Sequence, residues 1–499
     1  MSEKNYYQEN YRPQIHFSPE KNWMNDPNGL VYADGLYHLF YQHNPAGDLW
    51  GNISWGHAIS DDLLHWQHQP VAIKPNDKKD TLIFSGGCVH DFCNSSCLGS
   101  GDQTPLVAFY THSGDRGQNQ RQSISYSLDS GETWTEYEKN PVITNPGMKD
   151  FRDPKVFWYE PESLWIMLVA AGQSIFIYHS FNLLDWHFVS SFGERIGAHG
   201  GDWECPDLFA LPVDGDSSKL FWVLLVSINP GAPNGGSATQ YFIGEFDGKI
   251  FTPLDRHTRW MDFGPDSYAG ITWEAAPGQL TDRILIAWMS NWNYAFNLPT
   301  SPWRGQMTLP RKLTLVDRSD GLVLSSKPIS QLESLRGESI NFTPGQFGCL
   351  SKSLTLPPSA SFEIQLSVDI GPNVDVVGLS LSNSIGQKVE LYLDLLDNRL
   401  VIDRSKTLID ESLKNYPYSY SADCPMDGVN ILDLHVVCDS CSIEVFALNG
   451  TVVMTGLYFI EKPFDQVNLF NMEGESTIVD GKLWPLNSTW VISQTLEER

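Results

Sequence analysis

The chain has 499 residues, more than one hydrophobic core usually serves, so two domains are expected. Its 33 basic and 60 acidic residues give a formal net charge of −27, which disfavours nucleic acid and anionic membranes as partners and fits a neutral ligand. The longest apolar runs, LWIMLVAAG and LFWVLLVSI, are too short to cross a bilayer and are typical of buried strands.

The N-terminal stretch MSEKNYYQENYRP lacks the charged start and the apolar centre of a secretory signal. A protein with this sequence is expected to be cytoplasmic, or secreted if a signal has been removed from it. Cys88, Cys93 and Cys97 form the densest cysteine cluster, but the second pair of ligands that structural zinc sites usually show is missing. We therefore expect a loop with free or paired thiols, and neither a metal nor a cofactor. The oligomeric state is left open, a homo-oligomer included.

Residues 12–320 are predicted to form a five-bladed β-propeller. The stretches AISDDLLHW, SYSLDSGETW and YHSFNLLDW each place a short strand, a serine, a polar turn and a tryptophan in the same order, ending at Trp66, Trp134 and Trp186. These tryptophans lie about one four-stranded blade apart in the chain. Few stretches have a helical period, whereas alternating or wholly apolar runs bounded by Gly, Pro, Asn and Asp are frequent. The fold class is therefore predicted to be all-β.

Residues 321–338 are predicted to be a linker, with PISQLESLRG as its short helix. Residues 339–499 are predicted to form a β-sandwich that packs on the propeller. The stretches SFEIQLSVDI, KVELYLDLL and CSIEVFALNGTVVMT alternate between apolar and polar residues, as strands with one buried face do.

Three acidic residues share a setting beside a proline and next to an apolar, strand-like segment: Asp26 in WMNDPNGL, Asp153 in DFRDPKVFW and Glu204 in WECPDLF. Taken singly, each is typical of a turn. The innermost strands of a propeller converge on one axial cavity, so acids from successive blades can meet there. Converging carboxylates indicate glycoside hydrolysis, in which one ionised carboxylate attacks and one protonated carboxyl group releases the leaving oxygen.

Arg152 directly precedes Asp153 and is expected to keep that carboxylate ionised, so that a third acid can stabilise the oxocarbenium-like transition state. Several tryptophans offer flat faces for sugar C–H groups, although any one of them is more often part of a core. They are Trp23, Trp50, Trp55, Trp288, Trp292 and Trp303.

The chain resembles glycoside hydrolase family 32, the invertases, levanases and exo-inulinases. The three acidic motifs carry this resemblance, together with the stretches WGHAIS, FSGG, SINPGAPNGGSATQYFIGEFDG, DFGPDSYAG and WMSNWNYAFNLPTSPWRGQMTLPRKL. The resemblance implies a five-bladed propeller followed by a β-sandwich, and cleavage of a β-fructofuranoside with retention of configuration. By motif match it implies that Asp26 is the nucleophile, Asp153 the transition-state stabiliser and Glu204 the general acid/base.

The resemblance also implies a binding site for the terminal fructose, formed by Asn25, Gln42, Trp50, Phe84, Ser85, Arg152, Asp266 and Trp292. Gly87 departs from the family pattern, because many members have serine after FSG. The expected activity is exo-hydrolysis of terminal non-reducing β-D-fructofuranosides, in sucrose and in inulin- or levan-type fructans, by double displacement. SINPGAPNGGSATQYF favours the microbial levanases and exo-inulinases. Two alternatives stay open: a fructosyltransferase on the same scaffold and a propeller that binds fructan without catalysis.

Overall fold

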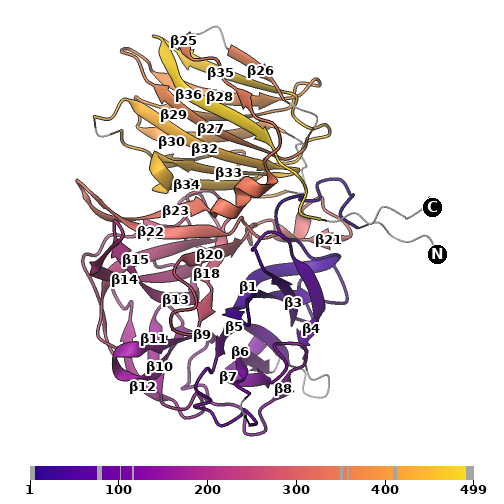
Figure 1. Cartoon of the computed structure of the whole chain (residues 1–499), viewed down its shortest axis with the longest axis vertical. Coiled ribbons are helices and arrows are strands. Elements are labelled where there is room, and N and C mark those ends of the chain that lie inside the picture. Colours follow the sequence, from indigo (N-terminus) through magenta and orange to yellow (C-terminus); the bar gives the residue numbers. More distant parts are fainter. Residues whose placement is uncertain are drawn as a thin grey trace, which may run out of the picture.

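The computed structural model describes residues 6–75, 81–101, 103–114, 117–348, 352–356, 359–407, 413–426 and 428–490. The regular secondary structure is almost entirely β-strand, and the chain divides into two parts, a propeller and a sandwich, that are stacked along the long axis (Figure 1). Within the described ranges, no helix is both long and apolar enough to cross a membrane. Short 3-10 helices lie between strands, at η3 (Glu160–Glu162), η4 (Ala295–Asn297), η5 (Ser330–Leu335) and η6 (Leu448–Gly450).

The propeller has five blades that follow one another along the chain. The first is β1 (Asn22–Ala33), β2 (Leu36–Asn44), β3 (Ser54–Ser60) and β4 (Gln67–Ile73). The second is β5 (Leu82–His90), β6 (Leu106–Gly114), β7 (Gln118–Ser127) and β8 (Thr135–Glu136). The third is β9 (Phe151–Tyr159), β10 (Leu164–Ala171), β11 (Ile175–Ser180) and β12 (His187–Phe192).

The last two blades share one sheet, because β13 pairs with β22. The fourth is β13 (Asp202–Val213), β14 (Asp216–Asn229), β15 (Ala238–Phe246), β16 (Phe251–Pro253) and β17 (Arg259–Trp260). The fifth is β18 (Tyr268–Thr272), β20 (Arg283–Trp288), β22 (Arg311–Arg318) and β23 (Gly321–Pro328). Two short strands tie this end of the chain to the first blade by pairing with β1: β19 (Glu274–Ala275) and β21 (Trp303–Arg304).

The innermost strands β1, β5, β9, β13 and β18 surround the propeller axis (Figure 1). Each contacts the next around the ring, and β18 contacts β1 again. The second strand of the third blade, β10, is covered on both faces: Ile166 and Leu168 pack in a cluster with the fourth blade, and Met167 and Val169 in a cluster with the second. This burial explains why the run LWIMLVAA, which forms β10, is apolar and buried at every position.

The tryptophan repeat marks equivalent turns in three blades. Trp66, Trp134 and Trp186 each follow the third strand of their blade, and each indole Nε1 donates to the carbonyl oxygen three residues earlier, at 2.9–3.1 Å. The serine that opens each turn donates to the Asp or Asn two residues later. These local bonds close the turn, so the sequence pattern has a direct structural cause.

The connection between the two parts begins later in the chain than the predicted linker. Residues 321–328 form β23, which pairs along its whole length with β22 as the outer hairpin of the fifth blade. The short helix follows as η5, and its Leu332 and Leu335 are buried in the propeller core.

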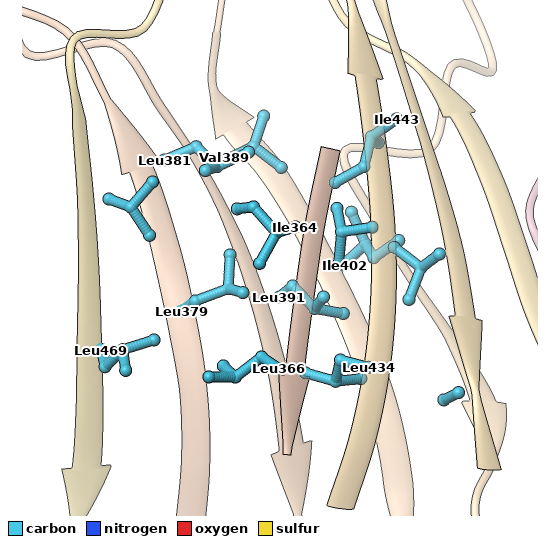
Figure 2. Close-up of a cluster of buried hydrophobic side chains, with 14 of the residues drawn as sticks. Ile364, Leu366, Leu379, Leu381, Val389, Leu391, Ile402, Leu434, Ile443 and Leu469 are labelled. Carbon is cyan, nitrogen blue, oxygen red and sulfur yellow. The ribbon is translucent and has the colours of Figure 1, made fainter. Parts of the chain in front are cut away.

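The sandwich consists of two antiparallel sheets. One contains β24 (Ile340–Asn341), β25 (Gly345–Phe347), β36 (Ser476–Pro485), β27 (Phe362–Asp369), β32 (Ile431–Asp439), β33 (Ser442–Ala447) and β34 (Val452–Leu457). The other contains β26 (Lys352–Thr355), β35 (Gln466–Met472), β28 (Val376–Ser382), β29 (Lys388–Asp394), β30 (Arg399–Lys406) and β31 (Ser419–Asp423). Figure 2 shows their apolar side chains meeting between the sheets, Ile364 and Leu434 from one and Leu379 and Leu391 from the other. Residues 491–499, the end of the predicted sandwich, lie outside the described residues.

A buried ionic network joins the two parts. Arg311 of β22 donates through Nε and Nη2 to Glu444 Oε2 of β33, at 3.0 and 2.6 Å, and through Nη1 to Asp262 Oδ2 at 2.8 Å. His16 lies between Glu444 Oε1 and Asp439 Oδ2, at 2.8 and 2.7 Å. Burial lowers its pKa, but these two acids outweigh burial and raise the pKa to about 9. All five groups are buried, so each charge depends on its partners across the boundary.

Arg311→Lys is expected to lower the free energy of unfolding by about 1–3 kcal/mol, because one ammonium group cannot reproduce the planar fork that reaches Glu444 and Asp262 together. The thermal midpoint of the whole chain measures the loss. Arg256→Lys, in an exposed loop, is the matched control. Equal midpoints for the two variants would contradict a stabilising role for this network.

Candidate active site

Each of the five innermost strands contributes one polar side chain to a cluster on the propeller axis. These residues are Asp26 of β1, Ser85 of β5, Asp153 of β9, Glu204 of β13 and Tyr268 of β18. The structure therefore brings the three predicted acids together, although they lie far apart in the sequence.

A β-bulge stands at the same place in all five innermost strands. Two residues of the inner strand face one residue of the second strand, and the pairing resumes immediately afterwards. The bulged pairs are Asn25–Asp26, Phe84–Ser85, Asp153–Pro154, Cys205–Pro206 and Ala269–Gly270. A bulge bends a strand and redirects its side chains, which here places the polar groups on the axis.

The bulges explain why the acids stand beside prolines. Proline has no N–H for the ladder and is tolerated where the ladder is interrupted. Pro154 and Pro206 lie inside their bulges, and Pro27 follows its own. Asp153 and Cys205 adopt left-handed backbone, with φ of 62° and 46°. Such backbone is uncommon for residues other than glycine, and here it occurs inside the bulges that carry the acid cluster.

Asp26 has one oxygen held by donors and one without any. Ser85 Oγ donates to Asp26 Oδ2 at 2.8 Å, and Cys205 Sγ lies 3.8 Å from the same oxygen. Oδ1 is buried and has no hydrogen-bond partner among the described residues. Burial, with a further contribution from the negative charge of Glu204, raises the pKa of Asp26 to about 6. At neutral pH this group is therefore mainly a carboxylate with a free oxygen.

Glu204 has both oxygens held by donors from other blades. Arg152 Nε donates to Oε1 at 3.1 Å, and the Tyr268 hydroxyl donates to Oε2. Arg152 is itself fixed by Asp150, whose Oδ1 lies 2.6 Å from Nη1. Burial raises the pKa of Tyr268 well above its ordinary value, so the phenol keeps its proton and remains a donor. The orientation of Glu204 is thus set by the third and fifth blades.

Asp153 is held mainly by backbone groups. The N–H of Cys205 donates to Asp153 Oδ2 at 3.0 Å, and the N–H of Asp153 donates to Thr111 Oγ1 at 2.9 Å. Burial and the charge of Glu204 raise the pKa of this carboxyl group, and Arg152 lowers it by less.

Arg152 acts on Asp153 in the predicted direction, because its charge lowers the pKa of that carboxyl group, but burial and Glu204 outweigh it. Its guanidinium donates to Asp150 and Glu204. Arg152 alone therefore does not set the ionisation of Asp153.

Four of the eight predicted fructose-binding residues lie beside the acids. Asn25 precedes it in the same bulge and accepts a hydrogen bond from Trp23 Nε1 at 2.7 Å. Gln42 lies on β2 opposite this bulge and donates to the Ile83 carbonyl at 3.1 Å. Ser85 bonds to Asp26 directly, as described above, and Arg152 bonds to Glu204.

Two of the six tryptophans combine a place near these groups with accessible surface. Trp50 is 39% exposed, and its ring centre lies 6.3 Å from that of Phe84. Trp292 is half-buried and lies 6.0 Å from Trp23. The other four, Trp23, Trp55, Trp288 and Trp303, are fully buried in the core.

The structure does not bring Asp266 into the cluster. Its Oδ1 accepts from Tyr294 at 2.6 Å, and its Oδ2 accepts from Arg404 Nη1 at 3.0 Å and from the N–H of Leu457 at 2.8 Å. Arg404 and Leu457 belong to the sandwich, so this buried carboxylate joins the two domains. A sugar hydroxyl would have to displace one of these partners.

Gly87 allows β5 to lie close to β9. A Cβ atom at this position would lie 3.1 Å from the Pro154 carbonyl oxygen and 3.3 Å from the Val156 nitrogen. A serine, the common residue in the family pattern, would press on the backbone that carries Asp153. The neighbouring strand would have to move by a few tenths of an ångström.

The thiols of Cys88, Cys93 and Cys97 are free, the first buried and the other two exposed. Their loop is organised by Asp91, whose two oxygens accept hydrogen bonds from Ser95 and Ser96. In the part of the chain that the structure describes, no group of three or more His, Cys, Asp or Glu side chains is arranged to hold a metal ion.

Three residues of the site were missed by sequence reasoning. Tyr268 donates to Glu204, and the N–H of Cys205 donates to Asp153. Thr111 accepts from the N–H of Asp153. Tyr268 and Cys205 stand inside the quoted stretches DFGPDSYAG and WECPDLF, so the motifs contained the signal. Thr111 had none, because its place depends on the pairing of β5 with β6.

Comparison with known proteins identifies the family. A model of the glycosyl hydrolases family 32 N-terminal domain matches residues 16–328, and one of the C-terminal domain matches residues 331–485. The chain belongs to glycosyl hydrolase family 32. It is therefore an enzyme, a glycoside hydrolase, and the alternative of a non-catalytic propeller is set aside.

Two curated relatives and one solved structure place the enzyme within family 32. It is 42% identical to a levanase of Bacillus subtilis, over 98% of this chain and 72% of the relative. It is 42% identical to invertase 2 of Saccharomyces cerevisiae, over 90% of this chain and 89% of the relative. The crystal structure of an exo-inulinase from Aspergillus awamori matches with a TM-score of 0.89 at 36% identity, covering 97% of this chain and 100% of that one. The predicted fold class, a propeller followed by a sandwich, is confirmed.

Proposed function

We propose that this family 32 enzyme removes terminal fructose from the non-reducing end of β-D-fructofuranosides, in sucrose and in inulin- or levan-type fructans, with retention of configuration. Relatives named levanase, invertase and exo-inulinase support this range of substrates. The observation that carries the proposal is the asymmetry of the acids: Asp26 has an oxygen free of donors, whereas both oxygens of Glu204 are held by donors.

The asymmetry fits two different duties. In the first step, Asp26 Oδ1 forms a bond to the anomeric carbon C2 as the glycosidic C2–O bond breaks, and Glu204 gives its proton to the leaving oxygen. In the second step, Glu204 takes a proton from water, whose oxygen attacks C2 and releases Asp26. Two inversions at C2 give net retention. Asp153 stabilises the oxocarbenium-like charge that develops in both steps.

A proton for the first step can be held by the cluster, because carboxyl groups that lie close together do not all ionise readily. Burial, and after it the negative charge of Glu204, raises the pKa of both Asp26 and Asp153. A proton held within this cluster can reach Glu204 when a substrate oxygen approaches.

Exo-action is supported by the relatives, two of which are named exo-inulinase. Beside the acids, the innermost strands are joined by a buried ion cluster. Lys155, two residues beyond Asp153 on β9, is buried and donates to the Thr272 carbonyl at 2.7 Å. Its ammonium lies 3.4 Å from Asp207 of β13 and 3.1 Å from Glu274 of β19. These contacts fix the strand that carries Asp153 against its neighbours.

Product analysis on sucrose, inulin and levan tests the proposal. Free fructose is expected as the first product from all three, without short fructan oligomers, and NMR of the earliest product should show the β-anomer. Oligomers that precede fructose would contradict exo-action, and an initial α-anomer would contradict retention. Oligosaccharides longer than the substrate, as the main products, would favour the fructosyltransferase alternative.

A further inference from the structure

Two lines of contacts lead outward from Asp26 to exposed aromatic rings. In the first, Ser85 donates to Asp26, and the ring of the adjacent Phe84 lies 6.3 Å from the ring of Trp50. Trp50 lies in the loop between β2 and β3 and is 39% exposed. This line therefore ends at solvent, in an indole beside the site.

The second line begins at Asn25, next to Asp26. Its side-chain oxygen accepts from Trp23 Nε1 at 2.7 Å, and the buried Trp23 ring stacks on Phe296 with centres 5.3 Å apart and planes at 19°. Phe296 lies on η4 and is 42% exposed. One face of this ring thus packs on Trp23, while much of the ring is open to solvent.

The two loops that carry these rings are tied together. Arg304 donates to the Phe296 carbonyl, and its Nη2 lies 3.5 Å from Asp48, two residues before Trp50. The carbonyl of Gly47 in the same loop accepts from the N–H of Trp23 at 2.9 Å. The rings therefore have a fixed backbone and need little ordering before they bind a ligand.

The exposed apolar surface at this place is more than one scattered side chain. Leu49, in the loop of Trp50, is 51% exposed, so three large apolar residues stand on two joined loops beside the acid cluster. Single exposed apolar residues are normal, but a group of them beside a polar site marks a binding surface.

We propose that Phe296 is a specificity-determining residue that binds the sugar unit next to the terminal fructose, by stacking its open face on the C–H groups of that leaving sugar. The inference rests on the proposed function, in which the terminal fructose occupies the acid cluster. Flat aromatic faces suit sugar rings, and a neutral sugar loses no charge solvation on this surface.

One consequence concerns the second chemical step. An acceptor sugar that attacks the fructosyl-enzyme must occupy the place that the leaving sugar has vacated, because transfer is the reverse of cleavage. Phe296 should therefore also favour transfer to an added sugar over transfer to water.

The test compares a donor with a leaving sugar to one without. In Phe296→Ala, kcat/KM for sucrose is expected to fall by about 3- to 10-fold, mainly through KM, since one aromatic contact is lost. For β-fructosyl fluoride, which has no leaving sugar, kcat/KM should stay within about twofold of the wild type. The ratio of transfer to hydrolysis with an added sugar acceptor should fall as well, and Phe296→Tyr should restore both.

Phe181→Ala is the matched control, because Phe181 is 67% exposed on the outside of the third blade. Equal losses on sucrose and on the fluoride in Phe296→Ala would show that the ring only supports Trp23, and would overturn the inference. Unchanged kinetics on sucrose would also overturn it. A wild-type enzyme that cleaved neither donor would overturn the proposed function, and this inference with it.

Discussion

Replacing Glu204 by alanine is expected to lower the turnover of sucrose by about 10²–10⁴-fold, the usual contribution of general acid catalysis. The same variant should be much less impaired on β-fructosyl fluoride, because fluoride leaves without a proton. Asp26→Ala should lose activity on both donors, because every substrate needs the nucleophile. Initial rates on the two donors measure the contrast, and Glu194→Ala, at an exposed loop position, is the control.

Azide gives the sharper contrast. In Glu204→Ala the Arg152 Nε and the Tyr268 hydroxyl lose their carboxylate and face the vacated space, which suits a small anion. Azide there can attack the fructosyl-enzyme without base assistance, and the product should be β-fructosyl azide with retained configuration. In Asp26→Ala no covalent intermediate forms, so azide can at best attack from the opposite face and give the inverted product.

Two outcomes would overturn these roles. Equal rescue of both variants by azide would mean that Asp26 and Glu204 do not have distinct duties. Rescue of Asp153→Ala with retention, in place of Glu204→Ala, would move the acid/base role to Asp153. NMR of the azide products distinguishes these cases directly.

The parts of the fold that could be predicted from sequence have local causes. Trp66 and its two equivalents close their turns through bonds to the carbonyl oxygen three residues earlier, so the repeat is visible in the chain. The prolines beside Asp26, Asp153 and Glu204 are also local, because each accompanies a break in one strand ladder. Blade number and the convergence of the acids followed from these signals.

The partners of charged groups could not be predicted, because they depend on register and domain docking. Arg152 stands beside Asp153 in sequence yet bonds to Glu204, in the next blade, because a bulge sets the direction of each side chain. Asp266 lies within a family motif, but Arg404 from the sandwich occupies its Oδ2. No pattern in the sequence aligns residues 266 and 404, since only the packing of one domain on the other brings them together.

Asp153→Asn is expected to lower the turnover of sucrose by about 10²–10³-fold, because a neutral amide cannot stabilise the positive charge of the transition state. At pH 8 the same variant should be more stable than the wild type, with a free energy of unfolding that is higher by about 1–3 kcal/mol. Its thermal midpoint should therefore be higher as well. An asparagine oxygen can still accept from the N–H of Cys205, so the local geometry is kept while a buried negative charge is removed.

The stability gain should depend on pH, and its sign follows from the direction of the pKa. Burial and Glu204 raise the pKa of Asp153 from its ordinary 3.8, so between that value and the raised one the native state binds more protons than the unfolded chain. The stability of the wild type therefore falls as the pH rises through this window, and the asparagine variant is spared that fall.

Thermal midpoints of the variant and the wild type, measured at two pH values, test this dependence. The variant should exceed the wild type by a small amount at pH 5 and by a larger amount at pH 8. Asp61→Asn, at an exposed position, should show no such trend. Two results would contradict this account: a stability gain of Asp153→Asn that is equal at both pH values, or a loss of stability at pH 8. Either would mean that the negative charge of Asp153 does not destabilise the native site.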